Sequence, residues 1–155
     1  PIETCKSPVI SGKKLAIVPI LRAGLGMVSG VQALVPTAKI GHIGLYRDEV
    51  THIPHEYYCK LPDPISERLI VVTDPMLATG GSMAAAIEAL YKTGKPRKIH
   101  IASVIATQEG IDTIRPVLPD DATVWCAAID AGMNEHKYII PGFGDCGDLC
   151  YGEKL

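Results

Sequence analysis

Aromatic residues are scarce in this sequence, which has one Trp and one Phe among 155 residues. The core must therefore rest on Ile, Val, Leu and Ala. No apolar stretch approaches the ~20 residues that a membrane-spanning helix needs, and no signal peptide is visible. Lys and Arg form no run and the net charge is −2, which argues against a dedicated nucleic-acid binder. These absences favour a globular protein of ordinary composition.

Cysteines are few and irregularly spaced, and their number, five, is odd. This pattern favours reduced thiols in a cytoplasmic protein over a disulfide framework. Cys146 and Cys150 lie close in sequence, but no second pair of Cys or His residues matches them as zinc ligands. We therefore expect no metal site built from side chains alone.

The length favours a single domain over residues 1–155. Apolar runs of strand length alternate with segments of helical periodicity. Strands are expected at 14–20, 39–46, 68–73, 98–105 and 123–129, and helices at 27–35, 82–93 and 108–117. Continuous apolar strands between helices predict an α/β fold, with a mainly parallel central sheet flanked by helices on both faces.

Two segments depart from this alternation. Residues 47–64 carry charged residues and three prolines, which predicts a projecting β-arm, at about 46–62, outside the core. The part from 130 to 155 is rich in Gly and polar residues and should be a loop with short strands. Ligands bind beyond the carboxyl ends of parallel strands, so loops 19–26, 74–82 and 130–146 should meet at one edge.

The segment 70–82 is the most informative part of the chain. An apolar run ends at Asp74, and a loop with Thr79, Gly80, Gly81 and Ser82 then opens onto a helical pattern. Free amides at a helix N-terminus bind anions, and glycines let the backbone approach closely. A carboxylate suits the hydroxyls of a sugar attached to that phosphate. The segment therefore predicts a ribose 5-phosphate site, and the alternative is a turn with Ser82 as helix cap.

Other candidates for chemistry are weaker when taken singly. The chain has no Gly-Lys-Ser/Thr sequence, which excludes a Walker phosphate loop. Arg22 follows a strand where loops should meet and can bind phosphate through two N–H groups, or it is a surface residue. Arg47 opens the arm and could close over a charged ligand, but an exposed salt bridge is an equal alternative. His136 is a candidate acid or base, although an isolated His is more often structural.

Taken together, several motifs resemble uracil phosphoribosyltransferases, a branch of the type I phosphoribosyltransferases. The resemblance covers nearly the whole chain in order. It rests on segments 18–27 (VPILRAGLGM), 46–47 (YR), 73–82 (TDPMLATGGS), 134–136 (NEH) and 138–145 (YIIPGFGD). Members of this family join uracil to 5-phosphoribosyl 1-diphosphate (PRPP), giving UMP and diphosphate with Mg²⁺. The resemblance implies the same reaction here, with the Mg²⁺ held mainly through the substrate diphosphate and water.

The resemblance also implies roles for individual residues. Asp74 would bind the ribose hydroxyls, and Arg22 and Arg47 would contact the diphosphate. Asp145 would lie next to both substrates, and Asp74, Arg22 and Asp145 are the candidate catalytic residues. The rest of the PRPP loop is Pro75, Met76, Leu77, Ala78, Thr79, Gly80, Gly81 and Ser82. Backbone groups of the C-terminal loop would recognise uracil, namely those of Ile139, Gly144, Asp145 and Cys146.

Some positions differ from the family pattern. Cys146 stands where Ala is usual, and Leu149-Cys150-Tyr151 departs from the typical tail. Family members carry several dozen residues ahead of the position where this sequence begins, and those residues help to form a dimer. We expect a homo-oligomer and a candidate GTP effector by the same resemblance, with no membrane and no nucleic acid as partner. Two other functions stay open, an RNA-binding regulator with this fold and a truncated form that binds ligands without turnover.

Overall fold

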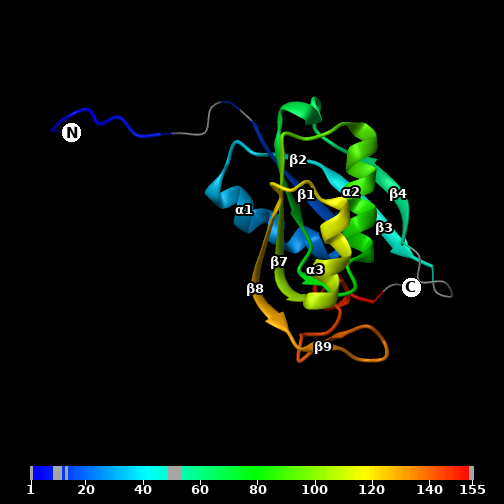
Figure 1. Cartoon of the computed structure of the whole chain (residues 1–155). Helices are drawn as coiled ribbons and strands as arrows, with labels where there is room; N and C mark the ends of the chain where they lie inside the picture. Colours follow the sequence, from blue (N-terminus) through cyan, green and yellow to red (C-terminus); the bar gives the residue numbers. More distant parts are fainter. Residues whose placement is uncertain (1, 9–11, 13, 49–53, 154–155) are drawn as a thin grey trace.

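The computed structural model describes residues 2–8, 12, 14–48 and 54–153. Its centre is an eight-stranded sheet with the order β4-β3-β1-β5-β7-β6, in which β2 also pairs with β1 and β8 with β7. Every pairing is parallel except that of β3 with β4. Figure 1 shows this sheet with α1 on one side and α2 and α3 on the other. The prediction of a mainly parallel sheet flanked by helices is confirmed.

The strands of this sheet are β1 (Leu15–Leu21), β2 (Lys39–Ile40), β3 (His42–Arg47), β4 (Pro54–Lys60), β5 (Leu69–Thr73), β6 (Met76–Leu77), β7 (Lys98–Thr107) and β8 (Thr123–Asp130). A separate antiparallel pair consists of β9 (Gly132–Met133) and β10 (Ile139–Ile140). The α-helices are α1 (Val28–Leu34), α2 (Gly81–Thr93), α3 (Gln108–Ile114) and α4 (Cys146–Tyr151). Three 3-10 turns complete the fold, at η1 (Ala23–Met27), η2 (Ile65–Glu67) and η3 (Arg115–Val117).

Two apolar layers lie on opposite faces of the sheet. Side chains of successive strand residues point to opposite faces. On β1, Val18 accordingly packs with Ile87 and Leu90 of α2, whereas its neighbour Ile17 packs with Val28 of α1. The core contains Ile, Val, Leu, Ala and Met with no fully buried aromatic residue among those described, in agreement with the composition.

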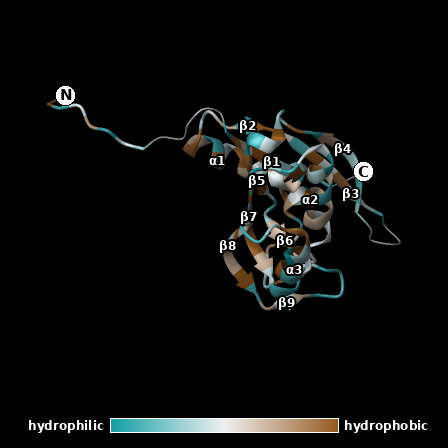
Figure 2. Ribbon diagram, turned by 45° about the horizontal axis from the view of Figure 1, so that its top comes forward, coloured by the Kyte–Doolittle hydropathy of each residue, from teal (hydrophilic) through white to brown (hydrophobic). Residues whose placement is uncertain are grey.

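On the face of the sheet that packs against α1, the side chains of β8 are left partly exposed. Trp125 and Ile129 of β8 are 61% and 55% exposed. Val124 and Cys126, which alternate with them, pack against the core on the other face. Figure 2 shows β7 and β8 as largely hydrophobic strands, whereas the loop next to β9 is hydrophilic. The expectation of helices over both faces therefore holds at β1 but not at β8.

The predicted β-arm corresponds to an antiparallel hairpin of β3 and β4, and the base of this hairpin belongs to the central sheet. Residues 54–60 form β4, an edge strand that pairs with β3 along its length. Cys59 and Leu61 pack against the core, which explains why this segment belongs to the sheet. Four consecutive residues of β4, 55–58, are exposed, and polar residues are tolerated on such an edge strand. The tip of the predicted arm, residues 49–53, lies outside the described residues.

The C-terminal segment contains the expected short strands and a helix that was not expected. β9 and β10 confirm the short strands, but 146–151 form α4. This helix has only six residues, too few for a periodic apolar pattern to show. Its N-cap is Asp145, whose carboxylate accepts a hydrogen bond from the Asp148 amide. Apart from this helix, the predicted elements agree with the observed ones to within a few residues.

Candidate active site

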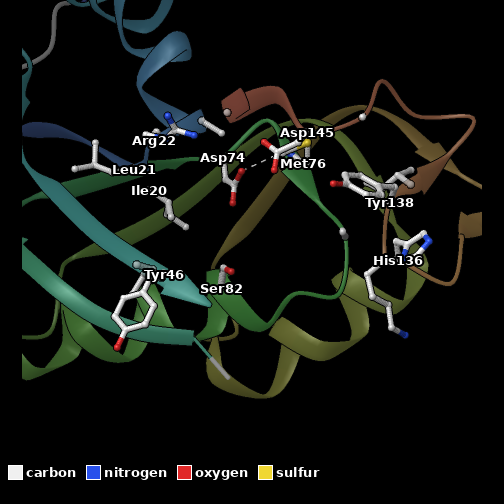
Figure 3. Close-up of a pocket in the computed structure, with 17 residues that line it drawn as sticks. Ile20, Leu21, Arg22, Tyr46, Asp74, Met76, Ser82, His136, Tyr138 and Asp145 are labelled. Atoms are coloured by element: carbon white, nitrogen blue, oxygen red, sulfur yellow. Dashed lines mark hydrogen bonds between the residues drawn. The ribbon is translucent and has the colours of Figure 1, made fainter. Parts of the chain in front are cut away.

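The three loops predicted to converge line one cavity of about 410 Å³. This volume is in the range of small-molecule sites. The lining includes Arg22 after β1, Asp74 after β5 and Asp145 before α4. In Figure 3, Asp74 follows β5, Ser82 lies in the first turn of α2, and His136 and Tyr138 come from the C-terminal segment. Parallel strand pairing brings β1 and β5 to the same edge, and this alignment explains the convergence.

The segment between β5 and α2 is held in place by contacts with β7 and α3. β6 pairs with Ile105 and Ala106 of β7, and the Ala78 carbonyl accepts a 2.6 Å hydrogen bond from the Thr107 hydroxyl. The same hydroxyl accepts from the Gly110 amide at the start of α3. These contacts hold the backbone of the segment still, so its amides are oriented before any ligand arrives.

Gly80 makes the turn into α2. Its φ is +79°, in the left-handed region that favours glycine, and it is the N-cap of α2 without a side-chain cap. The alternative that Ser82 caps this helix is therefore wrong. Ser82 instead lies one residue inside α2 and lines the cavity. The Gly81 amide donates a long, 3.5 Å hydrogen bond to the Thr79 hydroxyl. The N-terminus of this 13-residue helix favours an anion through its dipole.

Asp74 lines the cavity at the carboxyl end of β5. Its Oδ1 accepts a 3.3 Å hydrogen bond from the Met76 amide, the dashed line in Figure 3. Asp74 can therefore stabilise the turn and still bind a ligand, because a carboxylate has several acceptor positions.

Arg22 lines the cavity, but its guanidinium is already engaged by α4. Nη2 donates to Asp148 Oδ1 at 2.6 Å and Nη1 donates to the Gly152 carbonyl at 3.0 Å. The Nε atom is buried without a partner among the described residues. The peptide bond between Leu21 and Arg22 is cis. A guanidinium has five N–H donors, so besides the buried Nε–H one N–H on Nη1 and one on Nη2 remain for a ligand.

The structure does not bring all predicted residues to the cavity. Met76, Ala78, Ser82, Ile139 and Gly144 line it with Arg22, Asp74 and Asp145. Within the described chain, five residues of the predicted PRPP loop are not part of the lining, and they are Pro75, Leu77, Thr79, Gly80 and Gly81. Leu77 is core, with 1% of its surface exposed. Arg47 ends β3, and its side chain lies outside the described part of the structure.

Cys146 lies next to the cavity without lining it, and its amide donates to the Met76 Sδ at 3.3 Å. A thioether is a weak acceptor, so a better acceptor can displace it. Cys146 and Cys150 face each other across one turn of α4, with 3.8 Å between the sulfur atoms. All five cysteines are free thiols in this structure.

Burial raises the pKa of the Cys146 thiol to about 11, with smaller contributions from Cys150, Asp145 and Asp74. The reactive species is the thiolate, so Cys146 should react slowly near neutral pH. We expect iodoacetamide at pH 8 to modify the exposed Cys5 well before Cys146, and modification of Cys146 to accelerate as the pH approaches 11. Peptide mass spectrometry of timed samples measures both rates, and equal rates at pH 8 would contradict the protonated thiol.

Several lining residues were not predicted as binding residues. His136, Lys137 and Tyr138 come from the turn between β9 and β10, and Gly147 comes from α4. Lys137 has a φ of +63°, unusual for a residue other than glycine. His136 was left open, and the structure places it at the cavity with its side chain 72% exposed and 3.4 Å from Glu135. A turn of this kind has no periodic pattern by which the sequence could reveal it. Its one sequence signal is Asn134, a typical turn residue, whose side chain accepts hydrogen bonds from two amides.

A family model described as uracil phosphoribosyltransferase matches residues 1–153. The chain belongs to this family. A uracil phosphoribosyltransferase from Clostridioides difficile is 54% identical over 154 residues, which are 99% of this chain and 73% of that protein. The resemblance stated from the motifs is thus confirmed.

Two solved structures support the fold. The AQ2163 protein from Aquifex aeolicus has a TM-score of 0.87 and is 36% identical in sequence. The match covers 95% of the present chain and 69% of the AQ2163 chain. An adenine phosphoribosyltransferase from Rhodothermus marinus has a TM-score of 0.57 at 16% identity, covering 77% and 71%. At that identity the second match shows the fold alone.

Proposed function

We propose that this chain transfers the 5-phosphoribosyl group of PRPP to uracil, giving UMP and diphosphate, a reaction of pyrimidine salvage. One observation carries the proposal: Arg22, Asp74, Ser82 and Asp145, from three separate loops, line a single cavity. Family membership supports the same activity. The chain acts as one phosphoribosyltransferase domain in this proposal.

The start of α2 binds the 5-phosphate. Its amides and dipole favour an anion, and the hydroxyls of Thr79 and Ser82 add donors. Ser82 lines the cavity, and Gly80 makes the turn into α2. Asp74, at the other end of the segment, accepts hydrogen bonds from the ribose hydroxyls. A carboxylate there would repel a phosphate, so the two ends of the segment bind the two chemically different parts of one ligand.

Diphosphate is the leaving group, and its departure leaves positive charge on the ribose. Stabilisation of charge that develops in the transition state is the largest contribution available to this site. Arg22 neutralises the departing diphosphate with the N–H groups that α4 does not use, and Arg47 adds a second cation from the end of β3. The cavity also holds the uracil N1 in line with the breaking bond.

Uracil is recognised by backbone groups of the C-terminal segment. Ile139 and Gly144 line the cavity, and the Cys146 amide becomes available when uracil replaces the weak Met76 acceptor. Because the contact uses the backbone, a Cys at position 146 is compatible with it. The thiol stays protonated near neutral pH, since its pKa is about 11, and it adds no charge to the pocket.

The residues present fit Mg²⁺ held mostly by substrate and water. Among residues that the structure describes, no three His, Cys, Asp or Glu side chains form a metal site. Two carboxylates, Asp74 and Asp145, nevertheless line the cavity, and Mg²⁺ prefers oxygen ligands and retains water. When bound, the ion would neutralise charge on the diphosphate oxygens.

Incubation of the chain with labelled uracil, PRPP and Mg²⁺ tests the proposal directly. We expect labelled UMP to form and its formation to stop when a chelator removes the metal. Labelled uracil that binds without conversion would support the truncated, non-catalytic alternative instead. Filter binding to RNA at two salt concentrations tests the regulator alternative. The net charge of −2 predicts little salt-dependent binding there.

Further features belong to the proposal as well. The five free thiols suit a reducing, cytoplasmic location. In the described segments, no helix is long and apolar enough to cross a bilayer.

The exposed Trp125 and Ile129 suit a homo-oligomer, and analytical sedimentation would measure the oligomeric state. A GTP effector is proposed by resemblance alone, and rate measurements with added GTP test it.

Replacing Asp145 with Asn tests the base that removes the uracil N1 proton. Asn caps a helix as well as Asp does, so α4 should keep its structure. We expect turnover at saturating uracil to fall by about 100-fold or more, as for loss of a general base. Steady-state rates with both substrates saturating measure this. Unchanged turnover would rule out Asp145 as an obligatory base.

A further inference from the structure

Arg22 is held at both terminal nitrogens, by Asp148 of α4 and by Gly152, which follows this helix. Asp148 Oδ1 accepts from Nη2 at 2.6 Å, and the Gly152 carbonyl accepts from Nη1 at 3.0 Å. The two side chains are each about one-third exposed, at 33% for Arg22 and 34% for Asp148. Two acceptors on a planar guanidinium define its orientation as well as its position.

Asp148 is itself held in place through the backbone. Its amide donates to Asp145 Oδ1 at 3.0 Å, and its carbonyl accepts from the Gly152 amide at 2.9 Å. A continuous series of contacts therefore runs from Asp145 through Asp148 to Arg22. It joins the proposed uracil side of the cavity to the proposed diphosphate side.

The backbone around Arg22 is also fixed on its other side. The Thr73 hydroxyl, fully buried, donates to the Gly24 carbonyl at 3.0 Å and ties η1 to β5. Gly147 of α4 lies against Ala23, where an added Cβ would come within 3.7 Å of the Ala23 Cβ. The main chain of η1 is thus set by packing, and the side-chain direction of Arg22 is set by Asp148 and Gly152.

An ion pair this exposed contributes little to folding stability. Its effect on orientation is larger, because a free arginine side chain loses rotamer entropy when it binds a ligand. An arginine that is held before the substrate arrives has already lost that freedom. Asp148 is not among the cavity-lining residues, and its carboxylate contacts Arg22, which is.

We propose that Asp148 is a positioning residue that orients the Arg22 guanidinium for the diphosphate group. The inference rests on the proposed function and adds a residue that no motif assigns. Asp148 touches neither substrate, and its contribution passes entirely through Arg22.

Four variants test this inference: Asp148→Ala, Asp148→Asn, Arg22→Ala and the double variant. Asp148→Ala should raise KM for PRPP and weaken binding of inorganic diphosphate by at least about tenfold, since misplacement by 1 Å can cost about 100-fold. Asp148→Asn keeps an oxygen acceptor and should lose less. In the Arg22→Ala background, Asp148→Ala should have no further effect, because residues that act through each other are not additive.

Asp112→Ala is the matched control. Asp112 of α3 also accepts a side-chain N–H, from Gln108 at 2.9 Å, but it does not line the cavity. We expect unchanged kinetics for it. Thermal unfolding of every variant distinguishes a loss of folding from a misplaced Arg22 side chain. If Asp148→Ala is unstable, Asp148→Asn provides the same test.

Two results would overturn the inference. Additive losses in the double variant would show that Asp148 acts independently of Arg22. Tighter diphosphate binding by Asp148→Ala would show that Asp148 competes with the ligand for Arg22. Calorimetric binding of inorganic diphosphate needs no turnover, so this test remains decisive even if the unmodified chain proves inactive and the proposed function fails.

Discussion

Replacing Arg22 with Ala is expected to lower kcat/KM for PRPP by about 30- to 1000-fold, or about 2–4 kcal/mol of transition-state binding. Arg22 contacts the diphosphate in the bound substrate as well, and the charge on diphosphate grows as the bond to ribose breaks, so KM for PRPP should rise and kcat should also fall. In the part of the cavity lining that the structure describes, Arg22 and Lys137 are the cationic side chains, set against the carboxylates of Asp74 and Asp145. Removing Arg22 therefore leaves a strongly anionic leaving group poorly neutralised.

Two further variants control this measurement. Arg22→Lys keeps the charge but lacks the planar set of donors, so we expect partial activity. Lys14→Ala removes an exposed 3.0 Å ion pair with Glu67 away from the cavity and should leave kinetics unchanged. Near-normal turnover of Arg22→Ala would exclude the role that we assign to Arg22.

The second large effect is expected for Gly80→Ala. Gly80 has a φ of +79°, and an added Cβ would lie 2.7 Å from the Gly110 carbonyl oxygen and 2.8 Å from the Thr113 Cβ. The left-handed conformation alone costs a residue with a Cβ about 1–2 kcal/mol. The contact with α3 adds to this cost, because one of the two atoms belongs to the backbone. We expect the free energy of unfolding to fall by about 2 kcal/mol or more.

The same substitution should also weaken phosphate binding. To relieve the contact, the turn that presents the first amides of α2 has to move, and KM for PRPP should rise. Gly30→Ala is the matched control, since an added Cβ in α1 would meet nothing within 4 Å. Ala is the better helix former by about 0.5–1 kcal/mol, so this variant should gain stability and keep its activity. Similar behaviour of the two variants in denaturant unfolding would contradict the strained turn.

The sequence predicts the parts of this fold that depend on local pattern. The runs that became β1, β5 and β7 are apolar over strand length, and Gly94 and Pro96 mark the end of α2. Segment 74–82 is recognisable as a candidate site from its own residues, and Asp74, Met76, Ala78 and Ser82 of this segment line the cavity. Chemistry carried by one short stretch can be found without knowledge of the tertiary structure.

What the sequence could not predict depends on contacts between distant residues. Arg22 and Asp148 are 126 positions apart, and no local pattern pairs them. β4 has the composition of an exposed arm, yet its pairing with β3 and the packing of Cys59 place it in the sheet. Tertiary packing overrides local preference in both cases. The same reason explains why Leu77, inside the predicted PRPP loop, is buried in the core.

A crystal structure of this chain with bound PRPP tests the central claim most directly. Our account predicts the 5-phosphate at hydrogen-bond distance from the first amides of α2, the ribose hydroxyls at Asp74 and the diphosphate next to Arg22. A ligand bound elsewhere on the molecule, or a phosphate held away from the start of α2, would contradict it.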